Sequence, residues 1–268
     1  IYSKIGINED IVIKNILKVV PILVSLRQIN TLMNYTRLLI LMTFVACHTS
    51  GVNLKPTAIL ERSVAYHDPQ HLWESTRLNI HIQEPRLNNP LRHSIVTIAP
   101  KGKFELHRNK GKHIATYRIN DSNEHLVFLD GEVITDSLKI KQYRLESKRV
   151  VGYQKFYKTM LGLPMVLPKL ISDIEKVSET TFNQTASYQL QVRLKEALFS
   201  KHWLIYISKT SYNLLGIEMV FPEDPNKGER LYFDKEIIVN NMRLPRVRHW
   251  YGLDNSYSGS DIIVKHIK

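Results

Sequence analysis

From residue 78 onward, apolar and polar residues alternate over short stretches, which is the pattern of β-strands with one buried face. The predicted strands cover residues 78–82, 95–98, 104–106, 114–118, 125–129, 132–134, 188–194, 203–207, 214–221, 232–239, 242–251 and 262–264. Asp130-Gly131 and Asn240-Asn241 lie between neighbouring predicted strands. Both pairs favour two-residue hairpin turns, the first more decisively. The pattern therefore predicts an antiparallel sheet.

Helical periodicity is confined to two places. Residues 54–67 have apolar positions at helical spacing, with Pro56 suited to the first turn. A second helix is predicted over 154–161 and is ended by Gly162-Leu163-Pro164. Together these elements predict a mainly β fold with few helices (α+β), built as one domain over residues 54–268. We expect a strongly curved antiparallel sheet or half-barrel of about ten to twelve strands, with the helices covering an apolar cavity.

The N-terminal part of the chain carries the three parts of a secretory signal. Residues 33–46 begin with a short segment containing Arg37, continue with nine apolar residues and end with the small residue Ala46. The apolar run is shorter than the roughly 20 residues that a membrane-spanning helix needs. Cys47 follows directly, which resembles the lipobox of bacterial lipoproteins and implies diacylation of this thiol. The alternative is an uncleaved apolar helix or a buried core segment.

The residues on either side of this signal complete the predicted organisation. Residues 47–53 are mostly small and polar and are typical of a lipidated tether. Residues 1–32 are interpreted as an upstream extension or a leader, because the signal that starts at Met33 is complete without them. Phe44 departs from the lipobox, in which that position is most often Leu. The predicted location is the cell envelope, with the protein anchored in the outer membrane and facing the periplasm.

The chain is basic, with a formal net charge of +12. Most of its charges are scattered, as on an ordinary soluble surface. One stretch mixes cations and aromatic residues as headgroup sites do, and its candidate partner-binding residues are Arg243, Arg246, Arg248 and Trp250. The alternative is a polar strand face with core aromatics. For an exported protein we expect a lipid headgroup or cell-wall polymer, not a nucleic acid.

Few residues in the sequence point to catalysis. Cys47 is the single cysteine, so its acylation would leave no thiol nucleophile. The chain lacks a Gly-x-Ser-x-Gly elbow, a Walker loop and a dinucleotide fingerprint. The cluster His67-Asp68-Pro69-Gln70-His71 contains metal-ligand types, but Pro69 interrupts a continuous helix through both histidines. We therefore predict no catalytic residue, no metal and no cofactor, and leave open a hydrolase with an unrecognised carboxylate pair.

Residues 156–165 are rich in large apolar side chains and contain two methionines. A flexible apolar surface of this kind suits a lid over a hydrophobic pocket. The candidate ligand-binding residues are Phe156, Tyr157, Met160, Leu161, Leu163 and Met165. The alternative is a helix packed into the core.

Three segments carry a resemblance to a known family: 59–69 with Trp73, 157–165, and 241–248 with Trp250-Tyr251. Together they resemble an uncharacterised family of Gram-negative lipoproteins and secreted proteins, known only as a domain of unknown function. Such proteins are distantly similar to the LolA-like lipoprotein-carrier superfamily. That similarity implies an incomplete antiparallel barrel around a helix-lidded hydrophobic cavity, and it transfers no catalytic residue.

These observations lead to one functional hypothesis and two alternatives. The first is a non-catalytic envelope protein, anchored in the bilayer through Cys47, whose half-barrel binds a hydrophobic ligand such as an acyl chain. The second is a structural or interaction lipoprotein that uses the basic aromatic C-terminal hairpin. The third is the unrecognised hydrolase.

Overall fold

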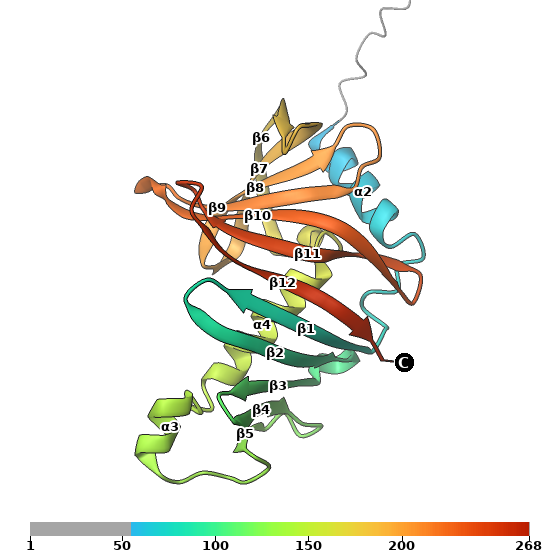
Figure 1. Cartoon of the computed structure of the whole chain (residues 1–268). Helices are drawn as coiled ribbons and strands as arrows, with labels where there is room; N and C mark the ends of the chain where they lie inside the picture. The colour runs from blue at the N-terminus through green and yellow to red at the C-terminus, as the bar shows by residue number, and fades with distance from the viewer. Residues whose placement is uncertain (1–54, 268) are drawn as a thin grey trace, which may run out of the picture. The chain divides into compact units, whose positions relative to one another are not determined.

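The computed structural model describes residues 55–267, and the strands in this part of the chain belong to one antiparallel sheet (Figure 1). The predictions for residues 1–32, for the signal segment 33–46 and for the tether 47–53 with Cys47 concern residues outside the described range. None of the helices between residues 55 and 267 is long and apolar enough to cross a bilayer.

The sheet of the described residues has twelve strands. Their bounds are β1 Leu78–Arg86, β2 Asn89–Ile98, β3 Phe104–Lys110, β4 His113–Ile119, β5 His125–Leu129, β6 Ile171–Phe182, β7 Thr185–Leu198, β8 Ser200–Ser208, β9 Leu214–Phe221, β10 Asp224–Val239, β11 Met242–Gly252 and β12 Tyr257–His266. Strands that follow each other along β1–β5 and β6–β12 are neighbours, and β12 returns to pair with β1. The two edges are β5 and β6, so the sheet is open and is not a closed barrel.

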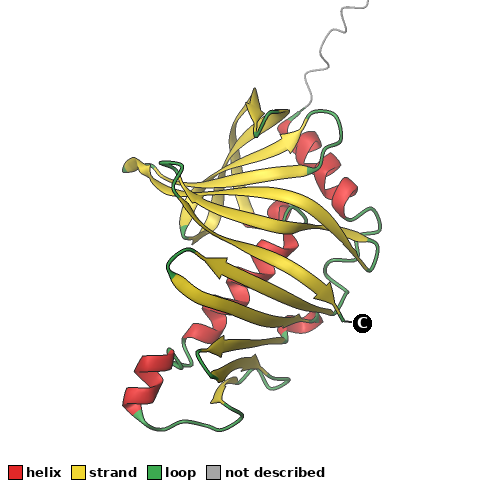
Figure 2. Ribbon diagram, viewed as in Figure 1, coloured by secondary structure: helices red, strands yellow, loops and turns green. Residues whose placement is uncertain are grey.

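The helices connect and cover this sheet. They are α2 Pro56–His67, α3 Ser137–Tyr143, α4 Arg149–Gly162 and α5 Leu167–Leu170, with a short 3₁₀ turn at Pro100–Gly102. Helices α3, α4 and α5 form the connection from β5 to β6. Figure 2 shows the strands as a curved layer with α4 lying across one face, where it contacts β2 to β5 and β11. Helix α2 contacts β6 and β11.

The core lies between the inner face of the sheet and α4. On β1, the alternate residues Leu78, Ile80 and Ile82 are buried, and the residues between them are half-buried. Helix α4 buries Met160 and Leu161 against this face. The period-2 pattern of the strands therefore supplies one apolar face, and the predicted fold class is confirmed.

Both predicted turns form, but only one joins two strands. Asn240 and Asn241 have positive φ and connect β10 to β11, with Val239 paired to Met242. Asp130 and Gly131 also have positive φ, yet the returning residues make only an isolated bridge from Glu132 to Leu129. The predicted strand 132–134 is therefore wrong, because the chain leaves the sheet here towards α3.

The sequence pattern missed α3 and β6. None of the α3 residues is buried, and only Ile140 and Tyr143 pack half-buried against the core. The start of α3 is marked by Asp136, whose carboxylate accepts from the Leu138 and Lys139 amides. Strand β6 is an edge strand with register shifts after Ile171 and Ile174, which break its alternation.

Candidate ligand-binding site around helices α4 and α5

The six candidate lid residues lie on α4 and on the loop that follows it. Five are buried, with exposed fractions of at most 8%, and Phe156 is half-buried. The buried five are Tyr157, Met160, Leu161, Leu163 and Met165. They share one hydrophobic core with the inner face of the sheet. In this structure the segment therefore packs as a helix into the core, which is the alternative that the sequence left open.

Phe156 connects this segment to the C-terminal strands. Its ring stacks on Trp250 with centroids 6.2 Å apart and meets Phe199 edge-on at 6.0 Å. The indole N–H of Trp250 donates to Asp261 at 2.8 Å. A residue expected to bind ligand and a residue expected to bind a partner thus pack against each other.

A buried polar network surrounds the hydroxyl of Tyr157. This hydroxyl donates to Glu84 Oε1 at 2.8 Å and lies 3.2 Å from Ser94 Oγ. The Arg108 guanidinium donates to the same hydroxyl and, at 3.1 Å, to Ser94 Oγ. The second oxygen of Glu84 accepts from Arg92. Both Glu84 oxygens therefore have partners, and this carboxylate is a buried counter-ion to Arg92 and Arg108.

Arg248 is a second charged group inside the fold. It is 1% exposed, and its Nε donates to the carbonyl of Met160 near the C-terminal end of α4, at 3.2 Å. Burial lowers the pKa of Arg248 to about 10, while the negative charge of Asp261 acts in the opposite direction. The negative end of the helix dipole favours a cation at this place. Arg248 therefore ties β11 to the C-terminal part of α4.

Residues of the short helix α5 line two separate hollows. The larger, about 420 Å³, is lined by Pro56, Thr57, Leu60, Glu61, Pro168, Ile171, Ser172, Asp173 and Ile174. The smaller, about 180 Å³, is lined by Glu74, Lys155, Lys158, Thr159, Val166, Lys169 and Leu170. The larger volume is within the range of small-molecule sites, and both have apolar floors. Helix α5 thus contributes to both apolar hollows.

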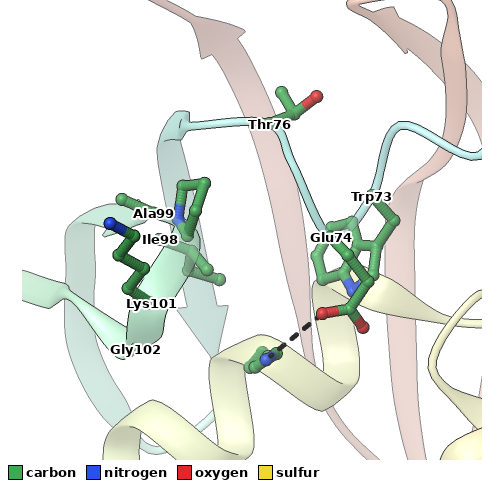
Figure 3. A pocket seen from close by; sticks show the side chains of 9 residues that line it. Trp73, Glu74, Thr76, Ile98, Ala99, Lys101 and Gly102 are labelled. Carbon is green, nitrogen blue, oxygen red and sulfur yellow. Dashed lines mark ion pairs between the residues drawn. The ribbon is translucent and has the colours of Figure 1, made fainter.

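A third hollow, beside Trp73, is too small for such a ligand. Its volume is about 40 Å³, which admits water but no acyl chain. Figure 3 shows Trp73 and Glu74 opposite the 98–102 turn, and its dashed line marks the ion pair between Glu74 and Lys158, with 3.9 Å between the charged atoms. Glu74 also pairs with Lys169 at 2.8 Å, and the hydrogen bond from Lys169 lowers the pKa of this carboxyl.

The structure separates the four candidate partner-binding residues by burial. Arg243 and Arg246 are exposed, whereas Arg248 and Trp250 are buried. Arg243 lies over the Tyr66 ring at 5.2 Å. Two of the four candidate residues are therefore exposed, and both of these are cations.

The histidine and aspartate at the end of α2 have structural partners. Nε2 of buried His67 accepts from the Leu214 amide at 3.0 Å, which leaves the proton on Nδ1, 2.5 Å from the Arg243 carbonyl. Burial lowers the pKa of His67, so the neutral ring is favoured. The Asp68 carboxylate accepts from the amides of Leu72 and Trp73 at 2.8 and 2.9 Å. Both residues fix the turn after α2.

Sequence reasoning missed the apolar residues around α5. Ile171 and Ile174 lie on the irregular edge strand β6, and Leu60 was predicted only as part of a helix face. The sequence signal for a separate short element here is Pro168. It follows Gly162-Leu163-Pro164 closely and indicates a second break in the helix.

Comparison with known proteins found similar solved structures at low sequence identity. A search of curated proteins found no match. Similar solved structures include a LolA superfamily protein from Nitrosomonas europaea, 9% identical with a TM-score of 0.44, covering 80% of this chain and 93% of that one. A domain described as an outer membrane lipoprotein-sorting protein domain, from Vibrio parahaemolyticus, is 8% identical with a TM-score of 0.40, covering 78% and 92%. A DUF1329 family protein from Desulfovibrio piger is 10% identical with a TM-score of 0.41, covering 78% and 91%.

The family assignment rests on a different comparison. The model of a family of unknown function, DUF6503, matches residues 35–265. The matched range contains all three segments that carried the resemblance in the sequence. The chain belongs to the DUF6503 family.

Proposed function

We propose that this chain is a lipid-anchored protein of the cell envelope that binds an apolar ligand, such as an acyl chain, beside α5 and without catalysis. The observation that carries the proposal is the pair of apolar hollows, about 420 and 180 Å³, that both have residues of α5 in their lining. A larger site for an elongated apolar molecule would arise if α5 moved.

Helix α5 is weakly held. Among its four residues only Leu167 is buried. Leu170 is half-buried against the core. The side chains that tie α5 to the rest of the fold are Lys195, which donates to the Lys169 carbonyl at 2.8 Å, and Glu74, which pairs with Lys169. Exposed ion pairs contribute about 0–1 kcal/mol each. Moving α5 aside would expose Leu167, at a cost of about 1.5–3 kcal/mol, together with the buried part of Leu170.

The charged groups of the interior favour binding over hydrolysis. Glu84 has both oxygens occupied, and the Asp261 carboxylate accepts from Trp250 and from Arg86. A carboxyl group that acts as a general acid or base must lie within hydrogen-bond reach of a substrate proton. These carboxylates instead neutralise and orient neighbouring side chains.

The position of the larger hollow suits exchange with a bilayer. Pro56 lines it and is nine residues after Cys47, the proposed acylation site. Nine extended residues span at most about 32 Å. An anchor at Cys47 would therefore hold the hollow within that distance of the membrane surface.

Binding of N-phenyl-1-naphthylamine, a neutral apolar probe that fluoresces in apolar sites, tests the proposal. The wild type should bind the probe. Ile171→Trp fills the larger hollow and Ile174→Glu places a charge in it, so each should weaken binding about tenfold. Ile238→Glu is the matched control, because Ile238 is an exposed isoleucine on β10. No probe binding by the wild type, or equal binding by all variants, would overturn the proposal.

A further inference from the structure

The inner face of the sheet changes from apolar to cationic along β3. Phe104 and Leu106 are buried on this face, Arg108 follows them, and Lys110 is next in the alternation. Ser94 of β2 is the partner of Arg108. Arg92 is two residues before Ser94, and Lys110 is two residues after Arg108. In this antiparallel register Arg92 therefore lies beside Lys110, and both side chains face the inner side of the sheet.

The segment between α3 and α4 covers this end of the sheet. Lys110 is paired with His113 of β4, and the His113 ring meets the Tyr143 ring with centroids 5.1 Å apart. Arg144 follows Tyr143, and its carbonyl accepts from the Tyr117 hydroxyl at 2.9 Å. The cation of Arg144 is thereby placed near that of Lys110.

Helix α4 begins at the same place. Arg149 is its first residue, its first turn contains no acidic residue, and no side chain caps it. The N-terminus of a helix carries about half a positive charge. Five cations and a helix N-terminus thus converge, and we call this cluster the cationic mouth: Arg92, Arg108, Lys110, Arg144 and Arg149.

The carboxylates of the described residues do not balance these charges. Glu84 pairs with Arg92 and Arg108, and Glu146 pairs with Arg149. Within residues 55–267, neither the Lys110 ammonium nor the Arg144 guanidinium has a hydrogen bond or ion pair to a side chain. Two cations of the mouth are therefore available to a ligand.

The imbalance has an electrostatic effect on Lys110. Burial, followed by the charges of Arg108, Arg144, Arg92 and Arg149, lowers the pKa of this ammonium to about 8. Arg144 is exposed and Lys110 is half-buried, so a dissolved ion can reach both. An anion here would offset the repulsion among these cations.

We propose that the cationic mouth is a binding site for a phosphate group, contacted by Lys110 and Arg144. Phosphate suits the mouth better than a carboxylate does, because it offers more acceptor oxygens and Arg binds phosphate bidentately. The phosphate could belong to a small soluble ester or to a lipid headgroup. The site does not depend on the apolar hollows beside α5.

Calorimetric titration of the full chain at low salt tests this site with three probes. They are sn-glycerol 3-phosphate, dihexanoylphosphatidylglycerol and dihexanoylphosphatidylcholine, used below micelle-forming concentrations. The test variant is Lys110→Gln with Arg144→Gln. The control is Arg77→Gln with Lys201→Gln, which removes the same charge from two exposed residues outside the mouth.

The proposal expects binding of at least one of the first two probes, weakened about tenfold or more in the test variant and unchanged in the control. Similar affinities for these two probes identify a soluble phosphate ester, and a clear preference for the phosphatidylglycerol identifies a headgroup. The proposal is overturned if neither probe binds or if both variants bind equally. Binding of the phosphatidylcholine alone, equal in all variants, would overturn the phosphate site while leaving the apolar site supported. Thermal melting of each variant verifies that it is folded.

Discussion

The indole of Trp73 lies directly against the backbone of Gly162, where α4 ends. A Cβ built on Gly162 would be 2.4 Å from Cζ2 of Trp73 and 2.5 Å from Cγ1 of Val166. These distances are far below ordinary van der Waals contact. Glycine is therefore required here by the close approach of two segments, and Trp73 fixes the end of α4 and the start of the path towards α5.

We expect Gly162→Ala to destabilise the protein by about 1–3 kcal/mol, because the added methyl group overpacks the Trp73 contact. Urea unfolding measures the effect. Gly152→Ala in the same helix is the control, since a Cβ there has no atom within 4 Å. It should stabilise the protein by about 0.5–1 kcal/mol through helix propensity. Equal effects of the two substitutions would contradict the proposed contact.

Tyr157→Phe should destabilise the protein by about 1–3 kcal/mol. The change removes a hydroxyl that satisfies both Glu84 and Arg108 in the interior, and buried polar groups are costly when unpaired. Tyr143→Phe serves as the control, because the Tyr143 ring packs on His113 and its hydroxyl is in no hydrogen bond within the described residues. If Tyr157→Phe melts at the wild-type temperature, the network does not stabilise the fold.

The predicted strands could be recognised because they have one face in the core. Residues 214–221 were predicted with their observed bounds, and the turn at Asn240-Asn241 was placed correctly. The elements that the sequence missed have no such face. Helix α3 buries none of its residues, and β6 is interrupted by two register shifts.

The functional surfaces were less predictable than the strands. Arg243, Arg246 and Arg248 look alike in sequence, yet Arg248 is buried under α4 while the other two are exposed. The cationic mouth joins β2, β3 and the segment from α3 to α4, so only the pairing of the strands brings Arg92 beside Lys110. Sequence spacing contains no signal for that juxtaposition.

Lys110→Met should raise the melting temperature at pH 7, since it removes a cation from among four arginines. The pKa of Lys110 is about 8 in the folded protein and near 10.5 when the chain is unfolded. Between these values the unfolded state binds more protons, so the wild type gains stability as pH rises. The advantage of the variant should therefore shrink from about pH 8 to pH 10.5. Melting curves of both proteins measure it, with Lys201→Met as the control. A constant difference across this range would show that the ammonium is not perturbed.

Acylation of Cys47 predicts that cells fed an alkyne analogue of palmitate will label the wild-type protein and not Cys47→Ser. The thiol is the only one in the chain, so a thioether-linked lipid has no other attachment site. Ser50→Ala is the control, because it alters the tether and keeps the thiol. Membrane association should follow the label, since each buried CH₂ group of an acyl chain contributes about 0.8 kcal/mol and two chains give stable anchoring. An unlabelled wild type, or a label that persists in Cys47→Ser, would contradict acylation of Cys47. The larger apolar hollow would then have no reason to lie near a bilayer. The phosphate site and the hollows themselves are tested separately.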